Sequence, residues 1–214
     1  MSHIAILGAT SITGGHLLQR LTATAGTTVT ALARTAPAGG GAAHHSAVEW
    51  VHGDATDPEV AARVIAGADA VITMVAARRD AAAGTVRSDA TRALLAALAD
   101  ADPAPHLVAV SALGGRASRE QQSRIARWVY GKAVGPERLA EVDRQEELIV
   151  VSGLPATVVR PPRLDDRPAS GYREVAGKAS VSLRLHRRDL ADCLADLALA
   201  PPPVAPRFLT IAST

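Results

Sequence analysis

Three small residues near the start of the chain have the spacing of a turn that can hold a phosphate group. Gly8, Ser11 and Gly14 follow one another at intervals of three, after an apolar stretch and before an amphipathic one. Glycine at the first place permits a tight turn, and glycine at the third lets the next helix pack close to the strand. Free N–H groups at the start of that helix favour an anion such as pyrophosphate. The pattern predicts a dinucleotide-binding loop, in which the Ser11 side chain either displaces the phosphates or donates a hydrogen bond to them.

Arg34 is the second residue whose place suggests chemistry. It directly follows an apolar stretch from Thr28 to Ala33, where an NAD-selective protein has an Asp or Glu for the ribose hydroxyls. A guanidinium beside Thr35 suits the additional phosphate of NADP instead. The alternative is a solvated arginine at a strand end. We therefore expect NADPH (NADP) as the cofactor.

Polar residues also follow other apolar stretches. Asp54 can accept a hydrogen bond from the adenine amino group. The alternative is that Asp54 is an ordinary turn residue. Ser111, followed by Ala112, can contact a substrate or the nicotinamide carboxamide, and a buried serine that satisfies backbone groups is the alternative. We expect the nicotinamide end of the cofactor beside these two residues and beside the stretch from Val75 to Arg78, which includes Ala76.

Apolar runs that alternate with helical periodicities must position these residues. The predicted strands are His3–Leu7, Thr28–Ala33, Val48–His52, Ala70–Val75, Leu107–Ser111, Ala156–Arg160 and a last one near Phe208–Ile211. Between them, leucines spaced by three and four predict amphipathic helices, and Asp57-Pro58 with a later Gly67 marks the start and end of one of them. The alternation predicts an α/β fold with a doubly wound parallel sheet, a Rossmann fold, in one domain over residues 1–214.

Two segments interrupt the alternation. The Gly- and Ala-rich stretch from Ala36 to Ser46 predicts a surface loop. Residues 161–179, rich in proline, glycine and charge, are too polar for a core. They follow a strand on the side where open α/β sheets bind ligands, so we expect a loop segment that covers the substrate.

Several kinds of chemistry lack support. A Tyr-x-x-x-Lys pair, in which the Lys lowers the pKa of a proton-donating Tyr, is missing. Tyr130-Gly131-Lys132 has another spacing, in a segment that Gly131 and Gly135 are expected to interrupt. The histidines share no metal-ligand spacing with carboxylates, so we expect no metal, and no G-x-S-x-G nucleophile turn occurs.

Composition limits the class of partner. Of 214 residues, 48% are hydrophobic and only two Trp, two Tyr and one Phe are aromatic, with a net charge of +2. Such a chain can bury a core but offers neither the basic surface nor the stacking faces of a nucleic-acid binder. No apolar stretch reaches the ~20 residues of a membrane helix, and the lone Cys193 permits no internal disulfide. We expect a cytoplasmic protein with a small-molecule substrate; the oligomeric state stays open.

Seven stretches together resemble a known family. They are ILGATSITGGHLL, VTALAR, VHGDATD, DAVITMVAARRD, VSALGG, VVRPPRL and HRRDLADCLADLAL. In this order they resemble the NmrA-like, atypical short-chain dehydrogenase/reductases, and among these most of all the flavin reductases, also called biliverdin-IXβ reductases. The likeness covers nearly the whole chain.

The resemblance implies NADPH held by the first loop and a planar substrate over the nicotinamide, beneath the segment that starts at Pro161. The cofactor-binding residues it implies in the first loop are Gly8, Thr10, Ser11, Ile12 and Thr13. It further implies Arg34 at the 2′-phosphate, Asp54 near the adenine, and Ser111 by the nicotinamide. Arg163 departs from the family, whose flavin reductases have a histidine there. Guanidinium hardly releases a proton, so we expect Arg163 to meet an anionic substrate.

The leading functional prediction is an NADPH-dependent reductase of a conjugated planar acceptor such as a flavin, quinone or tetrapyrrole, with Ser111 and Arg163 as catalytic residues. The first alternative is an NADP(H)-sensing regulator that binds a protein partner without turnover. The second is a non-redox catalyst of cyclisation or isomerisation.

Overall fold

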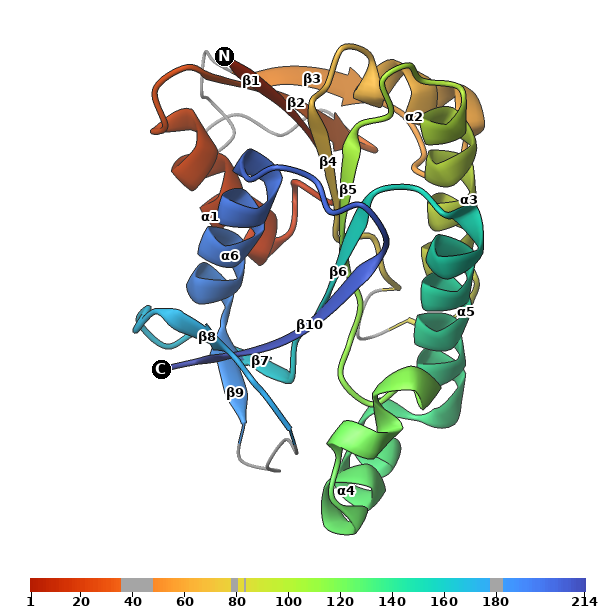
Figure 1. The fold of residues 1–214 in the computed structure, drawn as a ribbon, viewed down its shortest axis with the longest axis vertical. Coiled ribbons are helices and arrows are strands. Elements are labelled where there is room, and N and C mark those ends of the chain that lie inside the picture. Colours follow the sequence, from red (N-terminus) through yellow and green to blue (C-terminus); the bar gives the residue numbers. More distant parts are fainter. Residues whose placement is uncertain (36–47, 78–80, 83, 178–182) are drawn as a thin grey trace.

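A twisted sheet forms the middle layer of the molecule (Figure 1). The computed structural model describes residues 1–35, 48–77, 81–82, 84–177 and 183–214. The strands of the main sheet, in chain order, are β1 (Ser2–Leu7), β2 (Thr27–Ala33), β3 (Val48–His52), β4 (Ala70–Thr73), β5 (His106–Val110), β6 (Ala156–Arg160), β8 (Tyr172–Glu174) and β10 (Arg207–Ser213). Their order in space is β3-β2-β1-β4-β5-β6-β10-β8. All neighbours run parallel except β8, which pairs antiparallel with β10, so the predicted doubly wound parallel sheet is confirmed.

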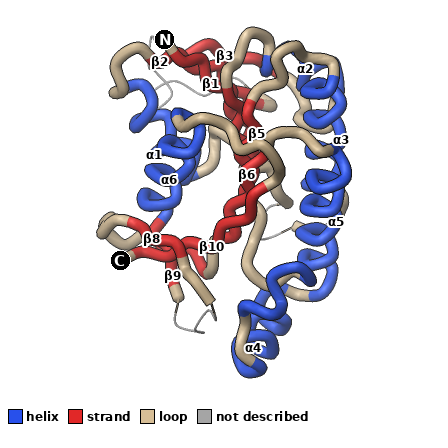
Figure 2. Tube along the Cα trace, in the orientation of Figure 1, coloured by secondary structure: helices blue, strands red, loops and turns tan. Residues whose placement is uncertain are grey.

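Helices cover both faces of this sheet (Figure 2). One face carries α1 (Ile12–Thr22) and α6 (Arg187–Leu199), which pack against each other. The other face carries α2 (Pro58–Ile65), α3 (Val86–Ala99) and α5 (Pro136–Ser152). No helix in the described part of the chain is long and apolar enough to cross a membrane.

The two helical layers explain why the strands are apolar without alternation. Ile4 and Ile6 of β1 pack on the side of α1 and α6, whereas Ala5 and Leu7 pack on the side of α2 and α3, and none of the four is exposed. A strand with core on both faces has apolar side chains at most positions, without a regular alternation. The continuous apolar runs in the sequence therefore correspond to strands that are covered by helices on both faces.

The predicted boundaries hold for several elements. Val48–His52 and Ala156–Arg160 are strands with the predicted ends. The Asp57 carboxylate caps α2 by accepting from the amide of Glu59, and Gly67 follows that helix with a φ of 70°. The strands predicted to reach Val75 and Ser111 end slightly earlier, at Thr73 and Val110.

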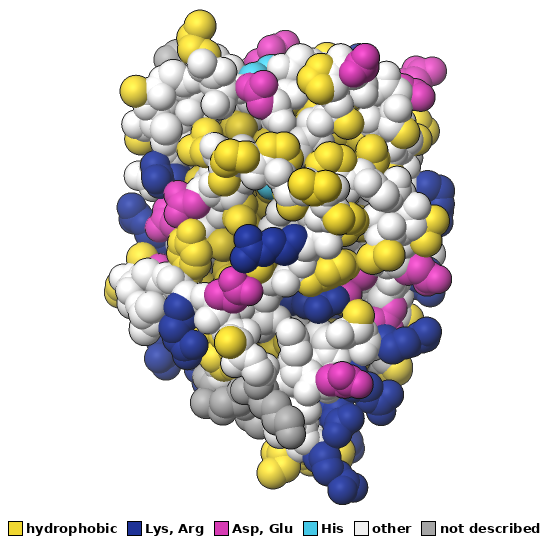
Figure 3. All heavy atoms as spheres, viewed as in Figure 1, with side chains coloured by type: hydrophobic (Ala, Val, Ile, Leu, Met, Phe, Trp, Pro, Cys, Tyr) yellow, Lys and Arg dark blue, Asp and Glu magenta, His cyan; other side chains and the backbone are white. Residues whose placement is uncertain are grey.

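The prediction that Gly131 interrupts the segment before α5 is wrong. Helix α4 (Arg124–Val134) runs through Gly131, after a 3-10 turn over Arg116–Gln121. The break comes at Gly135, whose φ of 86° suits only glycine, with Pro136 opening α5. Figure 3 shows basic side chains gathered at the end of the molecule that α4 forms.

Residues 161–179 contain strands, which corrects the prediction of a plain loop segment. β7 (Arg163–Asp165) pairs in parallel with β9 (Arg184–His186), and β8 extends the main sheet. Three-residue strands with one solvated side leave no apolar run to detect. The predicted loop from Ala36 to Ser46 lies outside the described residues.

Candidate functional site

The candidate site begins where the chain turns out of β1. β1 lies between β2 and β4, and the sequence order of strands reverses there, so the connections leave in opposite directions. Gly8 has a φ of 96°, and a Cβ on it would lie 3.2 Å from the backbone carbon of Met74. The Met74 amide in turn donates to the carbonyl of Leu7 at 2.9 Å. The turn therefore requires glycine for its conformation and for the close approach of β4.

Gly14 is required for a different reason. A Cβ on Gly14 would lie 2.3 Å from the carbonyl oxygen of Ala9, which is far inside van der Waals contact. At the next residue, Gly15, a Cβ would meet nothing within 4 Å. The contrast shows that Gly14, and not its neighbour, lets α1 start against the loop.

Ser11 is the N-cap of α1, which explains how a serine fits the middle place. Its φ of −77° is ordinary for any residue, and its hydroxyl oxygen accepts from the amide of Gly14 at 3.0 Å. The hydroxyl proton remains able to donate to an incoming group. The amides of Ile12 and Thr13 have no acceptor among the described residues, as is usual in the first turn of a helix.

These features fit the pyrophosphate of a dinucleotide. The start of α1 offers the two amides without an acceptor, the Ser11 hydroxyl and the positive end of the helix dipole. They lie beside a turn in which a Cβ on Gly8 or Gly14 would collide with the backbone. Thr10 and Ile12 are exposed at this end, with 61% of Ile12 accessible, whereas Thr13 is buried. The loop thus offers donors, and an exposed apolar side chain beside them.

Arg34 and Asp54 lie at the ends of the next two strands. β2 and β3 pair in register up to Ala33 and His52, so both residues follow the same edge of the sheet as Gly8. Arg34 is exposed. Hydrogen bonds from the amide and hydroxyl of Thr56 lower the pKa of Asp54, and the charge of Arg34 lowers it further. Asp54 thus forms a turn with Thr56, and its contact with adenine stays a prediction.

The segment after β4 is tied to α5. Val75 is half-buried and Ala76 is exposed, while Arg78 lies outside the described residues. Arg138, near the start of α5, donates to the carbonyl oxygens of Ala77 at 3.3 Å and Ala81 at 2.6 Å. Sequence reasoning missed Arg138, because nothing in its local pattern distinguishes it from a solvated helix arginine.

Ser111 lies at the end of β5, and its hydroxyl is engaged. It is 3% exposed and donates to Glu146 Oε1 at 2.6 Å. Glu146 in turn accepts from Arg160 Nε at 2.9 Å and from Arg160 Nη2 at 2.6 Å, with both side chains buried. The guanidinium of Arg160 also lies 4.4 Å from the centre of the Phe208 ring. The Ser111 proton therefore faces α5, and only the oxygen lone pairs can accept from another group.

Further polar side chains of α5 extend this buried contact toward α3. Arg87 donates to the carbonyl of Val110 and to Gln145 Oε1, each at 2.8 Å, and Glu141 accepts from the amide and hydroxyl of Ser88. Burial lowers the pKa of Arg87 to about 10, against the opposing effect of the glutamates. Sequence reasoning missed this layer; the one local signal was a charged Arg160 at the end of an apolar strand.

The Tyr130-Gly131-Lys132 stretch lies apart from that layer, on α4. The ammonium of Lys132 lies 5.5 Å from the ring centre of Trp128, which is 66% exposed, and the Tyr130 side chain is outside the described part. No group of three or more potential metal ligands occurs among the described residues.

Pro161 connects the site to the segment after β6. Its carbonyl accepts from the amide of Leu113 at 2.9 Å, just as the carbonyl of Val159 accepts from the amide of Ser111 at 2.8 Å. The chain from Ser111 through Ala112 to Leu113 therefore runs beside Pro161. Arg163 follows, exposed, on β7. These residues and the loop after β1 all follow carboxyl ends of parallel strands, the edge where open α/β sheets bind ligands.

A glycine turn at the switch point, an open helix N-terminus and an arginine after the second strand define a dinucleotide-binding protein of the Rossmann class. A family described as NAD(P)H-binding matches residues 8–201, so the chain belongs to the NAD(P)H-binding family, and the predicted class of cofactor is confirmed. No curated protein sequence matches the chain.

Solved structures share the fold at low sequence identity. A short-chain dehydrogenase/reductase from Veillonella parvula in complex with NADP has a TM-score of 0.80 and 16% identity, over 99% of this chain and 94% of that one. The anaerobilin reductase ChuY from Escherichia coli O157:H7 has a TM-score of 0.75 and 22% identity, over 99% and 97%. A putative NAD-dependent epimerase/dehydratase from Bacillus halodurans has a TM-score of 0.75 and 16% identity, over 100% and 95%.

Proposed function

We propose that the protein is an NADPH-dependent reductase that transfers hydride to a conjugated, planar acceptor. The observation that carries the proposal is the start of α1, at the switch point of the sheet. There Gly8 and Gly14 permit the close turn, and the amides of Ile12 and Thr13 have no acceptor among the described residues. The family match supports a nicotinamide cofactor, and the NADP complex and the reductase among the structural neighbours favour this reading over a non-redox one.

The choice of NADPH over NADH rests on Arg34. It is an exposed cation at the end of β2, where a ribose-binding carboxylate would otherwise stand. The nearest acidic residue on the next strand end, Asp54, is held in its own turn by Thr56. Arg34 is therefore assigned to the 2′-phosphate, with Asp54 toward the adenine.

The nicotinamide end is assigned to the edge formed by the ends of β4, β5 and β6. Val75 and Ala76 would line one side, Ser111 and Ala112 the middle, and Pro161 the other side. Arg78, which the sequence also assigns to the first side, lies outside the described residues. The bound nicotinamide supplies the hydride. Because the Ser111 proton is donated to Glu146, Ser111 acts as an acceptor for an N–H group and holds the reactants in position.

The absence of a Tyr-x-x-x-Lys pair suits an acceptor that takes its proton from solvent, as flavins, quinones and tetrapyrroles can. This is also the chemistry of the flavin reductases that the sequence resembles. Arg163, exposed beyond Pro161, places a cation on the acceptor side. Residues 1–214 would then act as one NAD(P)-binding domain, with 161–179 over the substrate.

The test is consumption of NADPH, followed by its absorbance, with FMN, a quinone and a linear tetrapyrrole as acceptors. We expect oxidation that needs both protein and acceptor. Tight NADPH binding without oxidation by any of the three would overturn the reductase and favour an NADP(H)-sensing regulator. Failure to bind NADP(H) would overturn both.

A further inference from the structure

Two arginines lie side by side on the small sheet that follows the candidate site. Arg163 of β7 and Arg184 of β9 are register partners in a parallel pair. Their neighbours Leu164 and Leu185 pack toward the core, with Leu185 fully buried. Because side chains alternate along a strand, both arginines lie on the opposite face, on strands about 4.8 Å apart.

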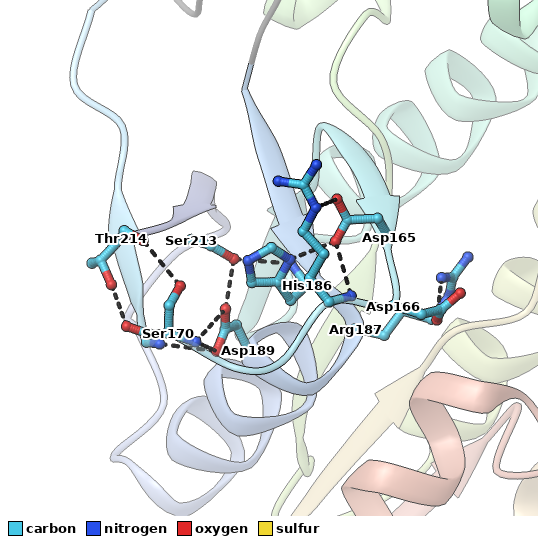
Figure 4. A network of polar contacts seen from close by, with 10 residues as sticks. Asp165, Asp166, Ser170, His186, Arg187, Asp189, Ser213 and Thr214 are labelled. Atoms are coloured by element: carbon cyan, nitrogen blue, oxygen red, sulfur yellow. Dashed lines mark hydrogen bonds and ion pairs between the residues drawn. The ribbon is translucent and has the colours of Figure 1, made fainter.

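Hydrogen bonds join β7 and β9 to each other on the face opposite Leu164 and Leu185 (Figure 4). On it, the ring Nδ1 of His186 lies 2.5 Å from Asp165 Oδ1, and this hydrogen bond joins β9 to β7. The backbone amide of His186 donates to Ser213 Oγ at 2.9 Å, which fixes β9 against the end of β10. Asp189, fully buried, accepts from the hydroxyl of Ser213 at 2.6 Å and from the amide of Ser170 at 3.1 Å. Arg163 and Arg184 therefore lie on two strands, β7 and β9, that these hydrogen bonds hold together.

The carboxylates of β7, β8 and the residue after β7 already have partners. Asp165 binds His186 and Arg167, Asp166 binds Arg187 at 2.6 Å, and Glu174 binds Arg207 at 3.2 Å. Neither Arg163 nor Arg184 forms an ion pair with any carboxylate in the described part of the chain. Like charges directly opposite each other on adjacent strands are unfavourable, and an anion bound by both arginines would offset that repulsion. Two planar donor forks match the oxygens of a phosphate or carboxylate.

The position of the pair relates it to the acceptor. β7 starts two residues after Pro161, which is hydrogen-bonded to the chain beyond Ser111. We infer that Arg163 and Arg184 together form an oxyanion-binding site for the acceptor, so that the natural acceptor carries a phosphate or carboxylate away from its reacting ring. The inference rests on the proposed function and adds Arg184 as a residue that selects acidic acceptors over neutral ones.

The test measures binding, which does not depend on turnover. Matched acceptors are titrated into protein saturated with NADP⁺: FMN against riboflavin for a phosphate, and biliverdin against its dimethyl ester for carboxylates. We expect the acidic member of at least one pair to bind about tenfold more tightly, as one charge-assisted hydrogen bond predicts. Preference for FMN alone identifies a phosphate, and preference for biliverdin alone identifies a carboxylate.

The variants Arg163→Ala and Arg184→Ala should each remove most of that preference, and Arg184→Ala should leave binding of the neutral acceptor unchanged. Arg184→Lys should restore part of it, because charge returns without the fork. Arg173→Ala on β8 is the matched control, with the same loss of charge on an exposed strand, and should keep the preference.

Equal binding of acidic and neutral acceptors, or equal effects of Arg184→Ala and Arg173→Ala, would overturn the site. If the preference and its dependence on the two arginines hold while no acceptor oxidises NADPH, the anion site stands and the reductase falls. If NADPH is oxidised equally well with acidic and neutral acceptors in every variant, the reductase stands and the anion site falls.

Discussion

At the scale of single residues, two adjacent glycines in one helix have opposite roles. Gly14 starts α1 against the carbonyl of Ala9, whereas Gly15 has open space where a side chain would be. Ser11 replaces a glycine at no conformational cost, because its φ is negative and its hydroxyl caps the helix. The chemistry of the loop therefore depends on Gly8 and Gly14 and tolerates a side chain at position 11.

Substitution of the two glycines tests this reading. Gly14→Ala should lower the free energy of unfolding by about 2 kcal/mol through overpacking and weaken NADPH binding at least about tenfold, because the loop must shift. Gly15→Ala should raise the free energy of unfolding by up to about 1 kcal/mol, since alanine favours the helix, and leave binding unchanged. Urea unfolding and NADPH titration of both variants measure these effects. Similar behaviour of the two would contradict the close contact at Gly14.

At the scale of elements, α5 fastens the ends of β5 and β6 through buried charge. Glu146 accepts from Ser111 at the end of β5 and from Arg160 at the end of β6. A buried ion pair adds little net stability compared with apolar packing, but removing one partner leaves the other charged and unpaired. The pair therefore fixes geometry around Ser111 more than it stabilises the fold.

Glu146→Gln should lower the free energy of unfolding by about 3–5 kcal/mol, because it leaves Arg160 buried without its counter-charge. Glu174→Gln breaks the Arg207–Glu174 pair, whose side chains are more than half exposed, and should cost less than about 1 kcal/mol. Urea unfolding at neutral pH compares the two variants. A loss below about 1 kcal/mol for Glu146→Gln would show that Arg160 reaches solvent or another partner.

The sequence predicts elements whose signal is local and misses those whose signal is tertiary. The strand Ala156–Arg160 is buried at every position because helices cover both of its faces, and its ends were predicted to the residue. Helix α4 carries exposed apolar and basic residues on a chain with an internal glycine, so neither propensity nor periodicity identifies it. β7 and β9 are short strands that become recognisable only through their pairing.

The residues of the candidate site also fall into two groups, those with a local sequence signal and those whose partners are distant in the sequence. The loop from Gly8 to Gly14 has a pattern within one turn, and Arg34 follows a strand directly, so both could be predicted. Glu146 and Arg184 act through residues distant in the sequence, Ser111 and Arg163, and no spacing connects these partners before the chain is folded.

At the scale of the whole molecule, the predicted residues gather at one edge of one sheet. The loop from Gly8 to Gly14 follows β1, Arg34 follows β2, Asp54 follows β3, Ser111 follows β5 and Pro161 follows β6. A dinucleotide laid across these ends would join the Arg34 side of the sheet to the Ser111 side. We therefore propose that the carboxyl edge of the sheet holds NADPH and that the small β7–β9 sheet lies beyond the acceptor.

The most direct test of this account is calorimetric titration of NADPH and NADH into the protein and into Arg34→Ala. Arg20→Ala, which removes an exposed cation near the end of α1, is the matched control. We expect the wild-type protein to prefer NADPH, and Arg34→Ala to weaken NADPH about 10- to 100-fold, the worth of a charge-assisted hydrogen bond, with NADH changed less than about twofold. Arg20→Ala should change neither. Equal weakening of both nucleotides by Arg34→Ala, or no binding of NADPH by the wild-type protein, would contradict the account.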